Sequence, residues 1–252
     1  MTRYSHSKLS QYENCPFAYN LHYNEGYDSP YETIEAFLGS RVHETLEKLY
    51  RDLENNKLDT LQELLDYYED RWNGEWHDGV INTSSQNDLA HHDKGVCCIE
   101  NYYNRFHPFD QIAIAGLETD EEMALPDGNT WSVRIDKFGF RGDTFYVCDY
   151  KTANRMKSQY DADTDRQLAM YARWVRQRYG KDKKVKLVWH MLKFNKDVES
   201  TRTNFELDIL VDGVMREIRE IESSKDWPTR VSPLCNWCIY RHKCPRFSSD
   251  DS

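Results

Sequence analysis

The sequence has no uninterrupted apolar run approaching the ~20 residues that a membrane-spanning helix needs. Its first residues also lack the apolar segment of a secretion signal. We therefore expect a cytoplasmic protein with no membrane partner. A Gly-x4-Gly-Lys-Ser/Thr stretch is absent too, which excludes a Walker-type ATP site within these 252 residues. Any helicase activity would have to come from a separate partner.

The chain is polar, but it does not lack aromatic residues. Hydrophobic residues make up 39% and charged residues 30%, and the mean hydropathy is −0.87. An aromatic content of 13% argues against disorder, because aromatic side chains supply much of a folded core. No internal repeat or low-complexity tract occurs, and we expect residues 1–252 to form a single domain.

Positive charge is scarce overall and concentrated in one stretch. The net charge is −10, yet residues 151–186 hold eleven Lys and Arg against four Asp. Residues 44–78 show the opposite bias, with eleven acids against four bases. Phosphate binding requires a local basic surface, not a basic protein. We expect the stretch after Lys151 to guide a nucleic-acid backbone; a solvated helix surface is the alternative.

Apolar spacing predicts a helical layer within residues 24–108. Residues 34–53 follow i, i+3, i+4 spacing and form a strongly amphipathic helix that contains Gly39 and His43. Residues 58–76 and 88–106 are predicted as two further helices. Ser7 is a candidate cap for an earlier helix, which Pro16 would disturb.

Residues 109–210 are predicted to form an α/β core. Three strands, expected as an antiparallel meander, cover residues 112–125, 131–140 and 144–150. The remaining elements expected are a helix at 163–179, a strand at 185–192, a further candidate strand at 204–209 and a helix at 212–221.

Asp136 ends one predicted strand region, and Asp149 and Lys151 end the next one, thirteen residues later. Period-two alternation places Asp149 and Lys151 on the same face of their strand. Two converging carboxylates repel unless a cation lies between them, and Mg²⁺ or Mn²⁺ suits oxygen ligands. Lys151 would stabilise transition-state charge or orient the attacking water. In a chain with 43 acids, exposed strand-end charges are the alternative.

Three residues on predicted helices could complete this site. Gln167 and Tyr171 lie at i, i+4 spacing and so share one helix face. His43 lies at the edge of the apolar stripe of its helix, and a neutral imidazole is a good Mn²⁺ ligand. The alternative for Gln167 and Tyr171 is ordinary helix packing, and the alternative for His43 is a partly buried structural histidine. Glu118 stands among other acids, and we leave it as a supporting residue.

The C-terminal region contains the pattern Cys-x2-Cys-x5-Cys, formed by Cys235, Cys238 and Cys244. In a cytosolic chain this spacing indicates a metal site and not disulfides. Three thiolates need a fourth ligand, and Cys15 is the best candidate. Zinc and an iron–sulfur cluster both accept four thiolates, and His242 would also allow a Cys3His zinc site.

Taken together, these motifs resemble the PD-(D/E)XK nuclease superfamily. The similarity is to its RecB-like members with a C-terminal cysteine cluster, which include CRISPR-associated and phage-encoded exonucleases and AddB-type domains. It covers nearly the whole chain, from Tyr4 to Cys244. Val133 departs from the pattern, because the family often has glycine three residues before the first acid. The motifs that carry the resemblance are Tyr4-Ser5-x2-Lys8-Leu9-x2-Tyr12-x2-Cys15-Pro16-x2-Tyr19, Gly39-x3-His43, Arg134-Ile135-Asp136, Asp149-Tyr150-Lys151-Thr152, Gln167-x3-Tyr171 and the four cysteines.

The resemblance implies a restriction-endonuclease-like core, which is a mixed sheet flanked by helices, with the N-terminal helical layer added. It also implies a role for each residue. Lys151 would assist the water, and Gln167 and Tyr171 would support the site and the DNA strand. The implied Mg²⁺ or Mn²⁺ ligands are His43, Asp136, Asp149 and the backbone carbonyl of Tyr150. The implied [4Fe–4S] ligands, which join Cys15 to the segment 227–247, are Cys15, Cys235, Cys238 and Cys244.

The implied function is a metal-dependent deoxyribonuclease, most simply an exonuclease acting on single-stranded DNA or duplex ends. Recombination, repair and CRISPR adaptation are all compatible pathways, with a helicase, a recombinase or CRISPR adaptation proteins as partners. Two alternatives stay open: a family member that binds DNA without cutting it, and a nuclease stabilised by zinc instead of an iron–sulfur cluster.

Overall fold

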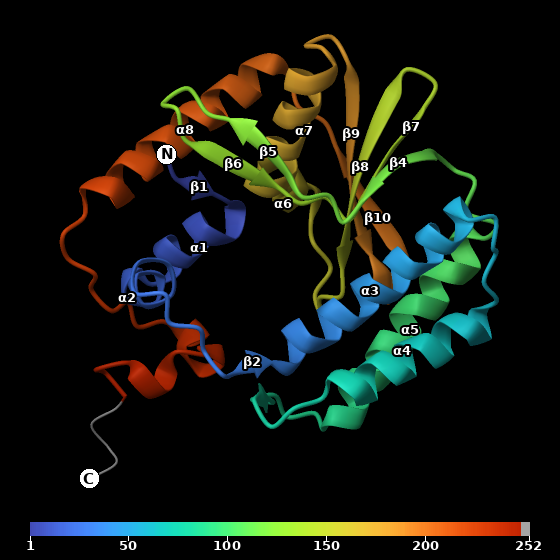
Figure 1. Cartoon of the computed structure of the whole chain (residues 1–252), viewed down its shortest axis with the longest axis horizontal. Coiled ribbons are helices and arrows are strands. Elements are labelled where there is room, and N and C mark those ends of the chain that lie inside the picture. Colours follow the sequence, from blue (N-terminus) through green and yellow to red (C-terminus); the bar gives the residue numbers. More distant parts are fainter. Residues whose placement is uncertain (248–252) are drawn as a thin grey trace.

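A computed structural model describes residues 1–247, and a five-stranded mixed sheet lies at its centre. The strand order is β10-β9-β8-β7-β4. Strands β8 and β9 run parallel, whereas the other neighbours are antiparallel. Helices cover both faces (Figure 1), so the predicted mixed α/β arrangement is confirmed. The strand bounds are Ala113–Leu117 (β4), Lys137–Arg141 (β7), Thr144–Lys151 (β8), Lys184–Met191 (β9) and Lys196–Ser200 (β10).

The predicted helical layer packs on one face of this sheet. It consists of α3 (Ile34–Glu54), α4 (Leu61–Glu75) and α5 (Asp88–Phe106). Thr33 caps α3 by accepting a hydrogen bond from the Ala36 N–H, and the apolar stripe of α3 is fully buried. The short strands β2 (Glu32–Thr33) and β3 (Val80–Ile81) pair beside the start of α3. This layer shares a core with Tyr150 of β8.

The opposite face is covered by α6 (Gln159–Thr164) and α7 (Arg166–Tyr179), and α8 (Asn204–Ser223) packs against α7. Trp131, Phe138 and Trp189 are buried in the core on this side. A second sheet in the order β1-β6-β5 joins the same core. Its strands are Arg3–Tyr4 (β1), Glu121–Ala124 (β5) and Thr130–Val133 (β6). None of the helices in the described part of the chain has the length and apolar character needed to cross a bilayer.

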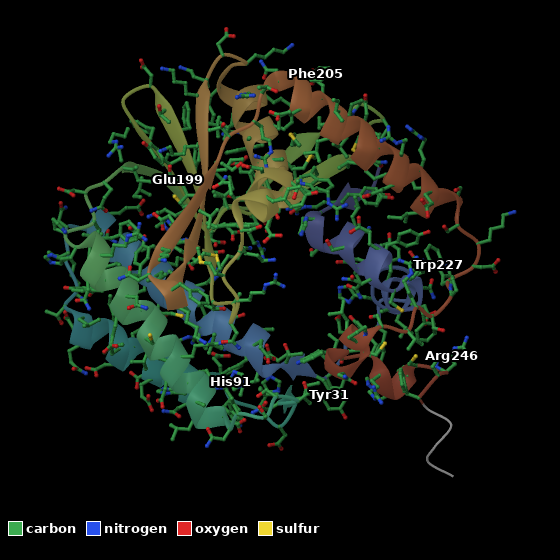
Figure 2. All side chains as sticks on the ribbon, turned by 180° about the vertical axis from the view of Figure 1, so that it is seen from behind. Tyr31, His91, Glu199, Phe205, Trp227 and Arg246 are labelled. Atoms are coloured by element: carbon green, nitrogen blue, oxygen red, sulfur yellow. The ribbon has the colours of Figure 1, made fainter. Side chains whose placement is uncertain are left out.

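The two ends of the described chain lie together. The N-terminal part contains α1 (His6–Asn14), α2 (Pro16–Tyr19) and a π-helical turn (Asn20–Asn24). The C-terminal segment, residues 227–247, contains the 3-10 turns Pro233–Trp237 and Arg241–Lys243. The Phe17 N–H donates to the Pro228 carbonyl at 3.2 Å, and the Ser29 hydroxyl donates to the Ile239 carbonyl at 2.8 Å. The ribbon therefore closes on itself, with α1 and the C-terminal segment opposite the central sheet (Figures 1 and 2).

The prediction of a single strand at 131–140 is wrong. Residues 130–133 form β6 in the small sheet, and residues 137–141 form β7 in the central sheet. The chain leaves one sheet at Arg134–Asp136 and enters the other. The strand expected at 112–125 divides in the same way into β4 and β5. The central meander is therefore β4-β7-β8, and β5 and β6 pair separately.

Two other boundaries also differ from expectation. Residues 204–209 are the first turns of α8 and not a strand, because the Thr203 side chain and Glu206 form a capping box. The helix expected at 163–179 is interrupted at Asp165, which ends α6 and caps α7 by accepting a hydrogen bond from the Leu168 N–H. This second cap sets the start of the helix that carries Gln167.

We predict that Gly95→Ala lowers the free energy of unfolding, although alanine favours helices over glycine by about 1 kcal/mol. A Cβ at Gly95 on α5 would overlap the Tyr68 hydroxyl, and Tyr68 is fully buried and cannot move aside. Overpacking of this kind costs about 1–3 kcal/mol. Urea denaturation followed by circular dichroism measures the change. Gly74→Ala on α4 is the matched control: nothing lies within 4 Å of its Cβ, so it should be neutral or stabilising, and equal effects of the two variants would contradict the packing argument.

Candidate metal centre and cysteine cavity

Asp136 lies at the break between β6 and β7, where the chain passes from one sheet to the other. Its side chain is only 10% exposed. Its Oδ2 atom accepts a hydrogen bond from the Tyr150 N–H at 2.6 Å. The carboxylate is thereby held against the end of β8, the strand that carries Asp149 and Lys151.

Glu118 faces Asp136 because the chain pairs locally at this break. The Glu118 N–H donates to the Asp136 carbonyl at 3.0 Å, and the Thr119 N–H donates to the Ile135 carbonyl at 3.0 Å. Glu118 has φ +40°, a left-handed conformation that costs energy in a residue with a side chain. Such strain is concentrated at functional sites in proteins, and here it accompanies a carboxylate aimed at the site.

His43 on α3 supplies the third group. Its Nδ1 atom lies 3.5 Å from Asp136 Oδ2 and 3.6 Å from Glu118 Oε1. Its Nε2 atom lies 3.0 Å from the Tyr150 carbonyl oxygen. The ligand atoms of His43, Glu118 and Asp136 all lie within 4.8 Å of one another. Glu118, which sequence reasoning left in a supporting role, is thus part of the set with metal-ligand spacing.

The donor set fits a divalent cation. Glu118 Oε1 is buried without a hydrogen-bond donor, and a cation would satisfy it. Burial alone would lower the pKa of His43, but the Asp136 and Glu118 carboxylates outweigh it and hold this pKa above its ordinary value. Burial alone would raise the pKa of Asp136, but His43 and the Tyr150 N–H lower it. Two carboxylates and an imidazole suit Mg²⁺ or, better, Mn²⁺.

This donor set opens onto a hollow of about 520 Å³. Four carboxylates and one guanidinium line it, so the hollow is acidic before any metal binds. The lining residues are Gly39, Ser40, His43, Glu44, Glu47, Glu118, Arg134 and Asp136.

Asp149 and Lys151 form an ion pair beside this set. The Lys151 Nζ atom lies 2.5 Å from Asp149 Oδ2. Asp149 is buried, and burial together with the nearby Asp136 charge raises the pKa of its carboxyl to about 6. Burial opposes the charged form of Lys151, but Asp149 outweighs it and raises the Lys151 pKa. Lys151 therefore presents a positive charge at the end of β8.

Gln167 and Tyr171 lie on α7 next to Lys151. The Lys151 ammonium donates to Gln167 Oε1 at 3.4 Å, and the Gln167 amide donates to the Tyr171 hydroxyl at 3.0 Å. Tyr171 is buried, and burial raises its pKa well above the ordinary range, so its hydroxyl stays neutral. Gln167 thus holds the Lys151 ammonium, and Tyr171 holds Gln167.

Behind the site lies a buried polar network that the sequence analysis did not identify. Lys137, which follows Asp136, donates to the Tyr50 hydroxyl at 3.0 Å and to the Tyr102 hydroxyl at 2.6 Å. Tyr102 in turn contacts the Tyr150 hydroxyl at 3.3 Å. The ammonium also lies over the Tyr50 ring, 4.6 Å from its centroid. The sequence shows that Lys137 follows Asp136 directly. It does not show that Tyr50 and Tyr102, which are distant in sequence, surround this lysine.

Comparison with known protein families matches residues 3–245 to the PD-(D/E)XK nuclease superfamily. The chain belongs to this superfamily. Nucleases of this superfamily are generally metal-dependent phosphodiesterases, so the expectation of a nuclease that uses Mg²⁺ or Mn²⁺ is confirmed at that level. A search of curated proteins found no match.

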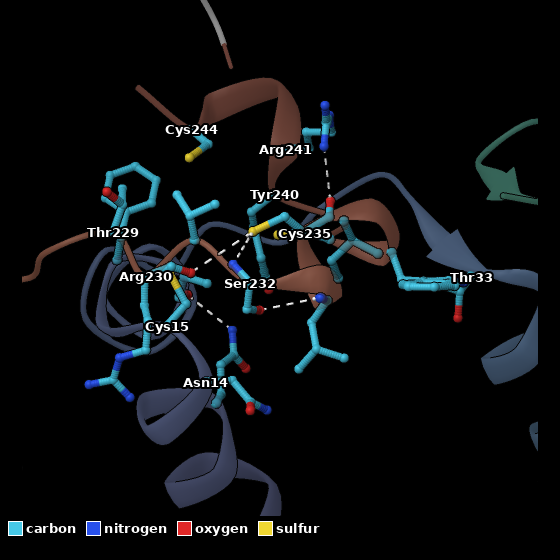
Figure 3. A pocket seen from close by; sticks show the side chains of 18 of the residues that line it. Asn14, Cys15, Thr33, Thr229, Arg230, Ser232, Cys235, Tyr240, Arg241 and Cys244 are labelled. Atoms are coloured by element: carbon cyan, nitrogen blue, oxygen red, sulfur yellow. Dashed lines mark hydrogen bonds between the residues drawn. The ribbon is translucent and has the colours of Figure 1, made fainter. Parts of the chain in front are cut away.

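A second cavity, of about 510 Å³, lies where the two ends of this nuclease chain meet. Cys15, Cys235, Cys238 and Cys244 all line it. Figure 3 shows Cys15, Cys235 and Cys244 placed around the same space, Cys15 from the end of α1 and the others from the C-terminal segment. The structure thus brings Cys15 to three cysteines that are more than 200 residues away from it in sequence.

The thiols of this cavity affect one another. Burial raises the pKa of Cys238, and the charges of Cys15, Cys235 and Cys244 raise it further, so four thiolates are unfavourable here without a cation. Among residues 1–247, no three of the cysteine sulfurs lie within 4.8 Å of one another. His242 does not line the cavity; its Nε2 atom lies 2.8 Å from the Tyr27 hydroxyl.

We predict that Glu118→Gln weakens Mn²⁺ binding by about 10-fold or more, because it replaces a charged donor that faces His43 and Asp136. Isothermal titration calorimetry of Mn²⁺ into the purified protein measures this. Glu47→Gln is the matched control, since Glu47 lines the same hollow but does not belong to the set with ligand spacing. Equal affinities for Glu118→Gln and the unmodified protein would remove Glu118 from the ligand set.

Proposed function

We propose that this nuclease is an exonuclease that cuts single-stranded DNA or the ends of duplex DNA. The observation that carries the proposal is the convergence of His43, Glu118 and Asp136 beside the Asp149–Lys151 ion pair. The proposed metal ligands are His43, Glu118, Asp136, Asp149 and the carbonyl of Tyr150. The proposed role of Lys151, supported by Gln167 and Tyr171, is in the chemical step.

In this proposal each side chain has a defined task. When bound, Mg²⁺ or Mn²⁺ supplies positive charge that polarises the scissile phosphate and makes water more acidic. Lys151 donates a hydrogen bond to a phosphate oxygen or to the attacking water and offsets the negative charge of the transition state. Gln167 keeps the Lys151 ammonium in position, because its amide oxygen lies 3.4 Å from Nζ and its amide nitrogen is held by Tyr171.

The proposed preference for strand ends rests on the acidic lining of the hollow and on the resemblance of the motifs to exonucleases of the superfamily. Contacts between residues 17–29 and 228–239 join the N-terminal elements to the C-terminal segment. The ribbon forms a closed loop (Figure 1). The acidic lining of the hollow also disfavours broad contact with a phosphate backbone.

We predict that Lys151→Met lowers the rate of DNA cleavage by about 10²-fold or more and leaves Mn²⁺ binding intact, because the ammonium acts in the transition state and not as a ligand. Asp149→Asn should lower both the rate of DNA cleavage and the affinity for Mn²⁺. Cleavage is measured on end-labelled linear DNA, both single- and double-stranded, with Mg²⁺ or Mn²⁺. Metal binding is measured by calorimetry.

Closed circular single-stranded DNA is the control substrate for this assay. An exonuclease leaves it intact, so efficient cutting of circles would replace the exonuclease proposal with an endonuclease. Undiminished cleavage by both Lys151→Met and Asp149→Asn would refute the site itself. DNA that is bound but never cut under either metal would indicate a family member that has lost catalysis.

We also propose that Cys15, Cys235, Cys238 and Cys244 hold a [4Fe–4S] cluster. Their common cavity and the mutual destabilisation of their thiolates support a bound cationic centre. A single tetrahedral zinc, with Zn–S of about 2.3 Å, would need sulfurs about 3.8 Å apart. No three of the cysteine sulfurs among residues 1–247 lie within 4.8 Å of one another, and we therefore propose the larger centre. When bound, such a cluster would join α1 to the C-terminal segment through Cys15.

We predict that protein purified without oxygen is brown and contains iron and acid-labile sulfide in equal amounts, near four of each per chain. Cys235→Ser should lose both and lower the melting temperature, because the chain ends then lose their link. Cys97→Ser is the matched control, since Cys97 is an exposed thiol on α5 outside the cavity. Colourless protein with one zinc per chain would assign the site to zinc instead.

A further inference from the structure

A basic hollow of about 580 Å³ lies at the end of the central sheet where β8 and β9 begin. Six of its lining residues are lysine or arginine, and one is acidic. The full lining is Thr144, Arg176, Lys181, Asp182, Lys183, Lys184, Val185, Lys186, Thr201, Arg202, Thr203 and Asn204. Phe205, which follows this lining, lies at the opposite end of the molecule from Arg246 of the C-terminal segment (Figure 2).

The inner wall of the hollow contains two guanidinium groups without acidic partners. Arg176 donates to the Arg202 carbonyl at 2.6 Å and to the Asn204 side chain at 3.0 Å. Arg202 is buried and donates to the carbonyls of Thr201 and Ala162. No carboxylate of residues 1–247 forms an ion pair with either group. Burial of an unpaired cation is costly, and an anion in the hollow would offset that cost.

The outer rim adds three exposed lysines, Lys181, Lys183 and Lys184. Within the described chain none of the three takes part in an ion pair, whereas Lys186 pairs with Glu199 at 2.8 Å. The rim therefore presents unneutralised charge to solvent in a protein whose net charge is −10. Thr201, Thr203 and Asn204 add polar side chains next to these cations.

The basic hollow is remote from the candidate metal centre. Thr144 pairs with Lys184 at the start of β8, and Lys151 pairs with Met191 at its end. Seven residue steps at about 3.3 Å each separate the two ends by about 23 Å. This distance corresponds to about seven base pairs of duplex DNA, at about 3.4 Å per pair.

The two hollows have opposite charge. The hollow at the metal centre is lined by Glu44, Glu47, Glu118 and Asp136, so it repels phosphate until a metal binds. Affinity for DNA must therefore come from elsewhere on the surface. We propose that the basic hollow is a second DNA-binding site that holds the phosphate backbone about seven base pairs from the cleavage site. This inference rests on the proposed function, because it assumes that DNA is the substrate.

Nucleic acid fits this hollow better than a single small anion does. Three exposed lysines lie within residues 181–184, interrupted only by Asp182, and their combined charge suits a row of phosphates better than one small anion. Hydroxyl and amide groups beside them are also common phosphate partners. Backbone contacts of this kind raise affinity without reading sequence.

The test compares DNA binding by Lys183→Ala/Lys184→Ala with binding by the unmodified protein, measured by fluorescence anisotropy without divalent metal. With a 20-base-pair duplex, the variant should bind about 10-fold more weakly at low salt. The slope of log affinity against log salt between 50 and 200 mM should fall by about 1 per lysine removed. A 6-base-pair duplex, too short to span both sites, should lose affinity as well, because without divalent metal the acidic hollow repels it and the basic hollow is its binding site.

Arg219→Ala/Lys225→Ala is the matched control, because it removes two exposed positive charges outside the hollow. The hollow variant should also keep its Mn²⁺-dependent hydrolysis of bis(p-nitrophenyl) phosphate, since this small substrate reaches only the metal centre. Equal binding of the long duplex by the hollow variant and the unmodified protein, or an equal loss in the control, would overturn the inference. The inference would also be overturned if poly-glutamate displaced the labelled duplex as strongly as unlabelled DNA of equal charge does. That result would assign the hollow to an acidic protein.

The outcomes separate this inference from the proposed function. Protein that cuts and binds DNA but is insensitive to the lysine substitutions refutes the second site alone. Protein that neither binds nor cuts DNA refutes both.

Discussion

The hydrogen bond from the Tyr150 N–H to Asp136 Oδ2 is the contact on which the candidate site depends. It joins the break between β6 and β7 to the end of β8, and so places the Asp136 carboxylate beside Asp149. The carbonyl of the same Tyr150 residue faces His43, so one peptide segment orients groups from three separate elements. A charge-assisted hydrogen bond in a buried setting is strong enough to maintain this arrangement against the repulsion between the carboxylates.

The side chain of Tyr150 extends this constraint into the core. Its hydroxyl contacts Tyr102, which accepts a hydrogen bond from the buried Lys137 ammonium. An ammonium in the core is costly unless every proton is satisfied, and here two tyrosine hydroxyls and the Tyr50 ring surround it. Lys137 also follows Asp136 directly in the chain. The core network and the metal centre are therefore two sides of the same strand segment, and a change in one would shift the other.

Much of the helical layer could be predicted from the sequence, because the apolar stripe from Ile34 to Leu53 repeats at the period of a helix. His43 was predicted for the same reason, since it borders that stripe. The division between β6 and β7 could not be predicted locally, because Val133, Ile135 and Phe138 are all apolar and buried on either side of the break. Glu118 was underestimated because three other acids follow it, and only its backbone pairing with Asp136 distinguishes it. For α8 the signal was present: Thr203 and Glu206 have capping-box spacing, but the polar–apolar alternation of residues 204–209 imitated a strand.

The contact between Phe17 and Pro228 has a consequence for how the protein folds during its synthesis. A chain leaves the ribosome from its N-terminus, and contacts between residues so far apart in sequence form slowly and late. The helical layer and the central sheet can assemble before residues 227–247 have been synthesised, but α1 and α2 then have no partner for Cys15. These elements gain their contacts only when residues 227–247 fold back onto them. A nuclease whose residues 227–247 have not yet been synthesised therefore lacks the contacts that hold α1 and α2 in place.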